Sequence, residues 1–142
     1  MDILNTFRIS GSALQAQSTR LNTISSNLAN VETTSTPEGG PYKKKSVVFQ
    51  STPLSFQDQL EEIRQGVQGV SVTKIAEDTS APRKVYNPSH PDAKEDGYVE
   101  MPNISVLEEM VDMMSATRSY QANVTSIKMA KRMAMKALEI GR

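Results

Sequence analysis

Apolar residues recur every seven positions along the N-terminal segment, in two interleaved series. The first series is complete: Phe7, Leu14, Leu21 and Leu28. The second is interrupted by two polar residues: Ile3, Ser10, Gln17, Ile24 and Val31. Apolar residues spaced by 3.5 positions form a narrow stripe on an α-helix, and such a stripe packs against a second helix. The pattern therefore predicts a long N-terminal helix that needs a helical partner.

A second, wider stripe follows the last proline, Pro102. Ser105 and Glu108 form an S-x-x-E capping box, which marks the start of a helix over residues 105–140. Acidic residues lie in its first turns and basic residues towards its end, an order that complements the helix dipole. The stripe has heptad-like spacing: Val106, Met110, Met113, Thr117, Tyr120, Val124 and Ile127.

The region between the two helices predicts short strands and loops. All seven prolines of the chain lie between residues 37 and 102, and proline is unfavourable inside helices. Alternating apolar and polar residues predict four strands: Lys44–Gln50, Val70–Ile75, Lys84–Tyr86 and Tyr98–Met101. Phe56, Leu60 and Ile63 have the spacing of a short amphipathic helical segment.

These elements predict an α+β fold with three parts. Residues 1–36 form the N-terminal helix and its following loop, and residues 37–102 a small β-rich middle domain. Residues 103–142 form a helix that pairs with the first as a coiled coil. The pairing hides one stripe of each helix, and the remaining apolar width of the second helix needs other chains. The residues expected to pack between subunits are Phe7, Leu14, Leu21, Ile24, Leu28, Met110, Met113, Tyr120, Val124 and Ile127.

Charge and composition exclude several classes of protein. Sixteen basic and sixteen acidic residues balance, whereas a general nucleic-acid binder carries a basic excess. Cysteine is absent and histidine occurs once, so thiolate and multi-histidine metal sites are excluded within one chain. No stretch of about 18 apolar residues predicts a membrane span, and the N-terminus lacks the features of a secretory signal peptide. We expect no cofactor, no metal and no insertion into a membrane.

Three groups of residues are candidates for chemistry. His90 and Asp92 form an acid–base pair by composition, but they lie in a proline-flanked loop without a nearby nucleophile, which favours a structural role. Glu108 and Glu109 point about 100° apart on a helix and do not share a site, so a role in capping the helix and complementing its dipole is the better interpretation. The basic run Lys43–Lys45 is interpreted as a solvated loop or strand start, with a patch that contacts phosphate or peptidoglycan as the alternative.

Three stretches resemble the axial proteins of the bacterial flagellum. Ser26–Thr33 resembles the Ala-Asn-rich motif that closes the N-terminal helix of rod and hook proteins, and Leu107–Met114 with Arg118–Asn123 resembles their C-terminal helix motif. Val85–Ala93 with Gly97–Asn103 is similar to proximal rod proteins. The residues that carry the two helix motifs are Asn27, Ala29, Asn30, Glu108, Glu109, Met110, Arg118, Tyr120, Gln121 and Asn123.

The resemblance implies a structural subunit of the flagellar basal-body rod and not an enzyme. Such subunits assemble helically with themselves and other rod subunits, and form part of the torque-transmitting shaft around the export channel. The resemblance also implies a location in the basal body across the periplasm, with delivery by the flagellar type III export apparatus and no cleaved signal peptide. Two alternatives remain: a soluble coiled-coil adaptor or export chaperone, and a hydrolase that acts through His90.

Overall fold

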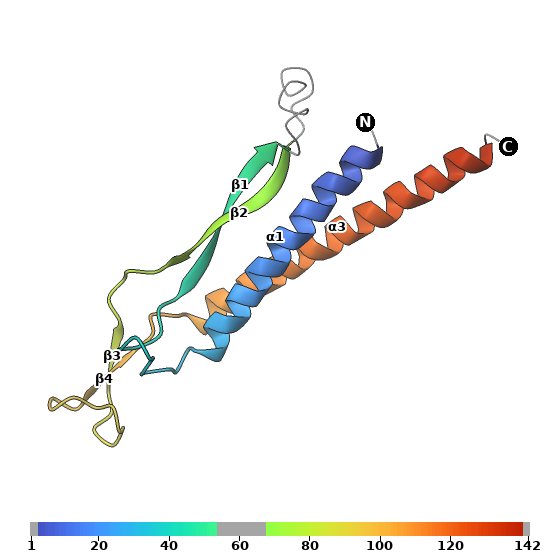
Figure 1. Ribbon diagram of the computed structural model, residues 1–142. Helices are drawn as coiled ribbons and strands as arrows, with labels where there is room; N and C mark the ends of the chain where they lie inside the picture. The colour runs from blue at the N-terminus through green and yellow to red at the C-terminus, as the bar shows by residue number, and fades with distance from the viewer. Residues whose placement is uncertain (1–2, 54–67, 141–142) are drawn as a thin grey trace.

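The computed structural model describes residues 3–53 and 68–140. Its elements are α1 (Ile3–Ala29), β1 (Lys45–Pro53), β2 (Gln68–Glu77), β3 (Arg83–Tyr86), β4 (Tyr98–Met101) and α3 (Val106–Ile140). Two long helices therefore flank a short region of strands, which confirms the predicted α+β class (Figure 1). The helical segment predicted around Phe56, Leu60 and Ile63 lies outside the described residues.

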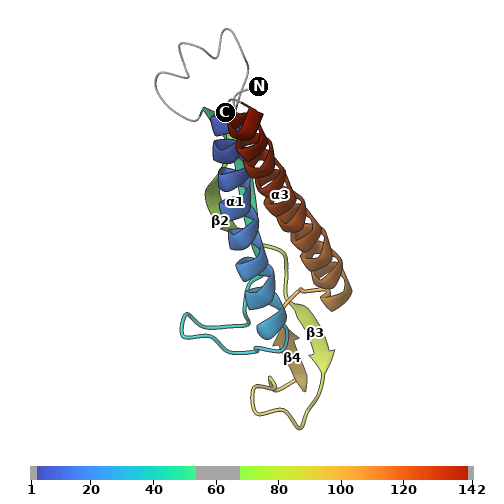
Figure 2. The same cartoon turned by 90° about the vertical axis from the view of Figure 1, so that its right-hand side faces the viewer.

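The two helices pack side by side and run in opposite directions (Figures 1 and 2). The start of α3 lies beside the end of α1, where Asn27 contacts Glu109. In Figure 1, α1 lies between α3 and the ribbon formed by β1 and β2, and it packs against all three elements. The predicted partner of the N-terminal helix is thus present within the chain.

Local hydrogen bonds fix where the helices end and begin. The side-chain amide of Asn30 donates to the carbonyl oxygen of Ser26 at 2.8 Å, just after the last residue of α1. Ser105 precedes α3, and its hydroxyl oxygen accepts a hydrogen bond from the Glu108 N–H at 3.5 Å. Ser105 is therefore the N-cap of α3, as the capping box predicts.

Small side chains occupy many of the buried positions of the two helices. Ala116 and Ala130 of α3 are 0% and 1% exposed, and Ala16, Ser10 and Thr23 of α1 are also buried. Small residues permit a close approach of two helix backbones, because little side-chain volume separates them. No helix in the described ranges is long and apolar enough to cross a membrane.

The strands form two separate antiparallel pairs. β1 pairs with β2 from Lys45↔Glu77 to Pro53↔Gln68, with a shift of register between Val48 and Phe49. Such a bulge bends a strand and increases its twist. The Ser12 hydroxyl of α1 accepts a hydrogen bond from the Val70 N–H of β2 at 3.1 Å, which attaches the ribbon to the helix.

The second pair, β3 and β4, forms a small hairpin at the far end of the molecule (Figure 2). The rings of Tyr86 and Tyr98 meet edge to face, with centroids 5.3 Å apart. Val99 of β4 is buried. All four predicted strands are confirmed, with boundaries that differ by at most a few residues.

Candidate functional site

A buried carboxylate joins three elements at the base of the molecule. Glu109, in the first turn of α3, is only 2% exposed. Its Oε1 lies 2.8 Å from Nζ of Lys44, the residue before β1, and its Oε2 accepts a hydrogen bond of 3.0 Å from the Asn27 amide of α1. We call these three residues the junction. Glu109 lies in the first turn of α3, as the dipole interpretation expects, but its carboxylate is also buried and paired within the protein, which the sequence did not predict.

Asn27 extends the junction to the backbone of β1. Its Nδ2 donates to the Lys45 carbonyl oxygen at 2.8 Å, and its Oδ1 accepts from the Lys45 N–H at 2.9 Å. The Tyr42 hydroxyl also donates to Oδ1, at 3.2 Å. One buried side chain thus satisfies both backbone groups at the start of β1 and binds the carboxylate of α3. Buried polar groups need such partners, because an unpaired one is costly.

The junction also raises the pKa of Lys44. Its hydrogen bond to Glu109 raises the pKa of the Lys44 ammonium above its usual value, and the charge of Glu109 acts in the same direction. Partial burial opposes this effect, because removal from water disfavours the charged amine. The hydrogen bond is the larger effect, so the Lys44 ammonium holds its proton more tightly where it contacts Glu109.

The three lysines at Lys43–Lys45 have different environments and do not form one basic patch. Lys44 is committed to Glu109. The Lys45 ammonium lies 3.8 Å from Oε1 of Glu77 and 5.9 Å from the centre of the Tyr42 ring. Lys43 is exposed. Two of the three charges are therefore used within the chain, which leaves little basis for a phosphate-binding patch.

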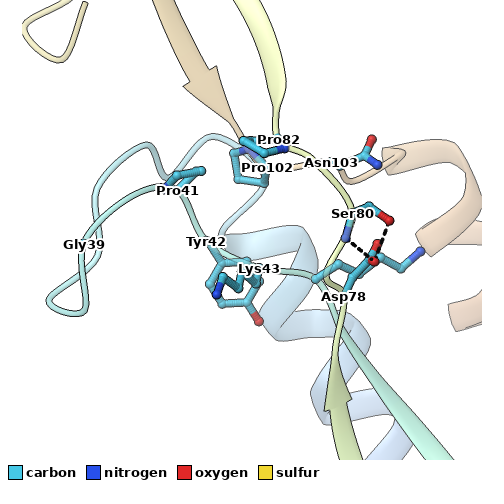
Figure 3. Close-up of a pocket in the computed structure, with 10 residues that line it drawn as sticks. Gly39, Pro41, Tyr42, Lys43, Asp78, Ser80, Pro82, Pro102 and Asn103 are labelled. Atoms are coloured by element: carbon cyan, nitrogen blue, oxygen red, sulfur yellow. Dashed lines mark hydrogen bonds between the residues drawn. The ribbon is translucent and has the colours of Figure 1, made fainter. Parts of the chain in front are cut away.

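A hollow of about 110 Å³ lies beside the junction (Figure 3). Pro41, Pro82 and Pro102 form part of its wall, and Asp78 lies opposite. The Asp78 carboxylate accepts hydrogen bonds from the Ser80 hydroxyl at 2.6 Å and the Ser80 N–H at 2.9 Å, and these bonds lower the pKa of Asp78. A carboxyl stabilised in its ionised form is poorly suited to donate a proton. Among the described residues, no group of three or more His, Cys, Asp or Glu could hold a metal ion.

His90 shapes the loop between β3 and β4. Its Nδ1 accepts a hydrogen bond from the Asp92 N–H at 3.1 Å. The Asp92 carboxylate instead accepts from the Thr34 hydroxyl at 2.6 Å, which links this loop to the segment after α1. The imidazole therefore bonds to the backbone of Asp92 and not to its carboxylate, an arrangement that stabilises a turn.

The residues predicted to pack between subunits have different exposures within one chain. Ile24 is buried, and Met110 and Tyr120 are exposed. The others are half-buried: Phe7, Leu14, Leu21, Leu28, Met113, Val124 and Ile127. The buried positions of α3 are Glu109, Ala116 and Ala130, and the stripe of large apolar residues did not predict the burial of Glu109 or Ala116. Positions 109, 116, 123 and 130 are spaced by seven, which could have indicated a buried helix face. Small and polar residues occupy these positions, so the face does not stand out as apolar.

The motif residues divide between the junction and the surface. Asn27 and Glu109 meet, and Asn30 ends α1. Asn123 is half-buried and donates to the Ser119 carbonyl oxygen at 2.9 Å. The remaining six are exposed: Ala29, Glu108, Met110, Arg118, Tyr120 and Gln121.

An apolar patch lies on the opposite side of α3 from α1. Leu107, Met110, Val111 and Met114 are between 52% and 73% exposed, and we call them the base patch. Their spacing of three and four residues places them on one helix face. Leu107 and Met114 each precede a buried residue by two positions, which corresponds to about 200° around the helix. The base patch therefore faces water in the isolated chain.

Comparison with known proteins supports the resemblance to flagellar rod proteins along the whole chain. Residues 7–35 match the flagella basal body rod protein family, and residues 95–140 match the C-terminal family of flagellar basal body rod FlgEFG proteins. The chain is 46% identical to the flagellar basal-body rod protein FlgC of Bacillus subtilis, over the full length of both chains. It is 45% identical to FlgC of Salmonella typhimurium, over 99% of each chain. The chain belongs to the FlgC family.

More distant FlgC proteins support this membership, since the Borreliella burgdorferi protein is 39% identical over 99% of this chain and 98% of its own length. The two family matches cover α1 and α3, which carry Asn27 and Glu109. The junction of this FlgC-family chain thus connects its two matched segments. Membership places the chain among structural proteins of the flagellar basal body and does not favour a coiled-coil adaptor or export chaperone.

Proposed function

We propose that this chain is a structural subunit of the flagellar basal-body rod that assembles helically through the exposed faces of its two terminal helices. Its partners are other rod subunits and further copies of itself, and the assembly transmits torque around the export channel. The base patch on α3 carries the proposal, because four large apolar side chains lie in water on a helix whose other side is already covered. Such faces mark sites of protein association.

The ten predicted packing residues have two roles in this proposal. Met110 and Tyr120 project from the surface and contact neighbouring subunits. The half-buried and buried members, such as Leu21 and Ile24, hold α1 and α3 in the arrangement that presents those faces. Each buried apolar side chain contributes about 1.5–3 kcal/mol, whereas an exposed ion pair contributes about 0–1 kcal/mol. Assembly therefore depends on the apolar faces more than on surface charges.

We further propose that the flagellar type III export apparatus delivers the subunit without cleavage of a signal peptide, and that the assembled rod spans the periplasm. The resemblance of the N-terminal segment to rod proteins supports this proposal. Mass spectrometry of the subunit recovered from purified basal bodies tests it. We expect a chain that still contains residues 2–20, and a chain that lacks this segment would contradict the proposal.

A charge placed in the base patch tests the assembly surface. Val111→Asp should prevent incorporation into the rod, because a buried and unpaired carboxylate is costly. Ser126→Asp is the matched control, since it places the same charge at an exposed position of α3 outside the base patch. Each variant is the only copy in a deletion strain, and rod content of purified basal bodies and swimming are measured, with export checked separately.

We expect rods and swimming with Ser126→Asp, and neither with Val111→Asp at normal levels of exported subunit. Equal incorporation of the two variants would contradict the proposed surface. A deletion strain that still assembles complete rods would contradict the proposed function itself.

A further inference from the structure

The ribbon of β1 and β2 buries few side chains that could fix the register of its strands. From Lys45 to Thr52 no residue of β1 is buried, and across Gln68–Glu77 only Gly69 is. Half-buried and exposed residues alternate at the start of β1, so a slip of two residues would return the same kind of residue to each face. Residues 54–67 separate the strands, whereas the hairpin loops that fix a register have about two to five residues. The register therefore needs another source.

The backbone of β1 is held at its first residue by Asn27 of α1. Nδ2 of Asn27 donates to the Lys45 carbonyl oxygen at 2.8 Å, and Oδ1 accepts from the Lys45 N–H at 2.9 Å. The side-chain amide thus pairs with Lys45 as a residue of a neighbouring strand would, because it offers one donor and one acceptor together. The preceding carbonyl oxygen, of Lys44, accepts instead from the N–H of Asp78, which follows β2, at 2.7 Å. Asn27 therefore fixes which residue of β1 lies at this end of the ribbon.

The backbone of β2 is held by Ser12, near the other end of α1. The single proton of the Ser12 hydroxyl is donated to the Ile9 carbonyl oxygen at 2.8 Å. The hydroxyl oxygen is then oriented to accept from the Val70 N–H, at 3.1 Å. Because the partner is a backbone group, this contact depends on where Val70 lies along the helix and not on its side chain.

The two contacts have the same spacing on the helix and on the ribbon. Ser12 and Asn27 are fifteen residues apart on α1, or about 22 Å at about 1.5 Å per residue. Val70 pairs with Ser51, which is six residues, or about 20 Å, from Lys45 along β1. A slip of two residues moves one strand by about 7 Å, so it would break one of the two contacts.

The Asn27 contact depends in turn on α3. In the described ranges, α3 packs against α1 and against neither strand of the ribbon (Figure 1). Its Glu109 carboxylate nevertheless accepts the second N–H of the Asn27 amide, at 3.0 Å, and the Tyr42 hydroxyl donates to Oδ1. Every donor and acceptor position of the amide is then used, and a flipped amide would direct its N–H groups at the Lys45 N–H. Glu109 therefore helps to hold the orientation in which Asn27 pairs with β1.

We propose that Asn27 and Ser12 set the register of the β1–β2 ribbon on α1, and that Glu109 makes this register depend on the pairing of α1 with α3. Asn27 and Ser12 are positioning residues, since they act on the backbones of the strands. Glu109 acts through Asn27. A displacement of α3 along α1 is thereby transmitted to the start of β1, although the helix and the strand do not pack together.

Disulfide formation between the strands measures their register. The chain contains no cysteine, so two introduced thiols report on one pair of positions. Gln50→Cys with Ser71→Cys places the thiols on partners in the observed register, and Gln50→Cys with Thr73→Cys places them two residues out of register. Cα atoms of a disulfide lie within about 7 Å, and diagonal neighbours are about 7–8 Å apart. The first pair should therefore oxidise about tenfold faster than the second in the dilute full-length chain, with free thiols counted by alkylation and mass spectrometry.

Single substitutions in α1 test the two contacts. Asn27→Leu should lower the ratio of the two oxidation rates about tenfold, and Ser12→Ala about threefold, because each removes hydrogen bonds that distinguish one register. Ser18→Ala is the matched control, since Ser18 is exposed on the same helix, and the ratio should not change. Alanine is a strong helix former, so Ser12→Ala keeps α1 and decides the question even when Asn27→Leu does not fold.

Two variants that differ only at residue 109 test the dependence on α3. Both carry Lys44→Met, so that no cation is left without its partner. Glu109→Gln keeps an oxygen that accepts from Asn27, and Glu109→Leu removes it. We expect the ratio of the unsubstituted chain with Glu109→Gln and a ratio about threefold lower with Glu109→Leu. An equal ratio in these two variants would show that the register does not depend on α3.

Amide hydrogen exchange of α1 in the same variants separates a change of register from unfolding. Native protection of α1 is expected in Ser12→Ala and in both variants at residue 109. An unchanged ratio in Ser12→Ala would overturn the inference, as would a ratio that falls equally in Ser18→Ala. A ratio that falls only where α1 loses its protection would also overturn it, because the strands would then respond to the loss of the helix and not to the two contacts.

Discussion

At the scale of single residues, the junction shows how three polar side chains hold α1, β1 and α3 together. Asn27 and Glu109 are 1% and 2% exposed, yet both are polar, and each satisfies the other. A buried ion pair adds little to stability by itself, but loss of one partner leaves a charge without compensation. The junction therefore fixes how α1, β1 and α3 meet more than it increases the total stability.

Removal of Lys44 from its pair with Glu109 should lower the stability of the chain. We expect Lys44→Met to lower the free energy of unfolding by about 2–4 kcal/mol, because Glu109 stays buried without its cation. This value is below that of a fully buried pair, since the Lys44 side chain is 27% exposed. Lys44→Met with Glu109→Leu should recover most of the loss, because neither charge remains. Urea denaturation of both variants gives the comparison, and a double variant no more stable than the single one would disprove the interpretation.

The same pair predicts how stability depends on pH. The pKa of Lys44 is raised above its value of 10.5 in the unfolded chain, so its contribution is fully present below pH 10.5. The contribution is lost as the pH rises through the pKa of the folded state, because the amine then deprotonates. The difference in unfolding free energy between the wild type and Lys44→Met should be constant at neutral pH and shrink above pH 10.5. A difference that shrinks instead between pH 7 and pH 9 would contradict this assignment.

At the scale of elements, periodicity predicted both helices and all four strands, because their patterns depend on local spacing. The identity of the buried positions in α3 depends on the partner helix. Ala116 and Ala130 are buried where the helices approach closely, and a search for large apolar residues overlooks them. Glu109 is one residue from the exposed Glu108, and only the place of α1 determines which carboxylate is buried. Long-range contacts of this kind leave no local pattern in the sequence.

The hairpin of β3 and β4 depends on one glycine. Gly97 has a φ of +74°, and an added Cβ would lie 2.9 Å from Cε2 of the Tyr86 ring. Gly97→Ala should therefore destabilise the hairpin by about 1–3 kcal/mol. Gly11→Ala is the matched control, since Gly11 lies in α1 with no atom within 4 Å of the new Cβ, and it should stabilise the chain by about 0.5–1 kcal/mol.

Amide hydrogen exchange of β3 and β4, together with thermal unfolding, measures both effects. Faster exchange confined to the hairpin of Gly97→Ala, with an unchanged or higher unfolding temperature for Gly11→Ala, is the expected result. Unchanged exchange in Gly97→Ala would show that the hairpin does not need the positive φ.

At the scale of the whole molecule, the chain is extended, and the two helices leave much apolar surface in water. Among the described residues, fourteen large hydrophobic side chains outside β1 and β2 are exposed, and eleven of these lie on α3. A chain that balances 16 basic and 16 acidic residues is not strongly repelled from its own copies. This combination suits a protein whose final form is an assembly and not a free subunit.

The central claim is that the base patch becomes buried when the chain enters the rod. Maleimide labelling of Val111→Cys tests it most directly, because the chain has no other thiol. The thiol should react readily in the isolated subunit and be protected in intact basal bodies, and it should react again once those basal bodies are denatured. Equal labelling of the isolated subunit and of intact basal bodies that contain it would show that the patch stays in water, and would contradict the account.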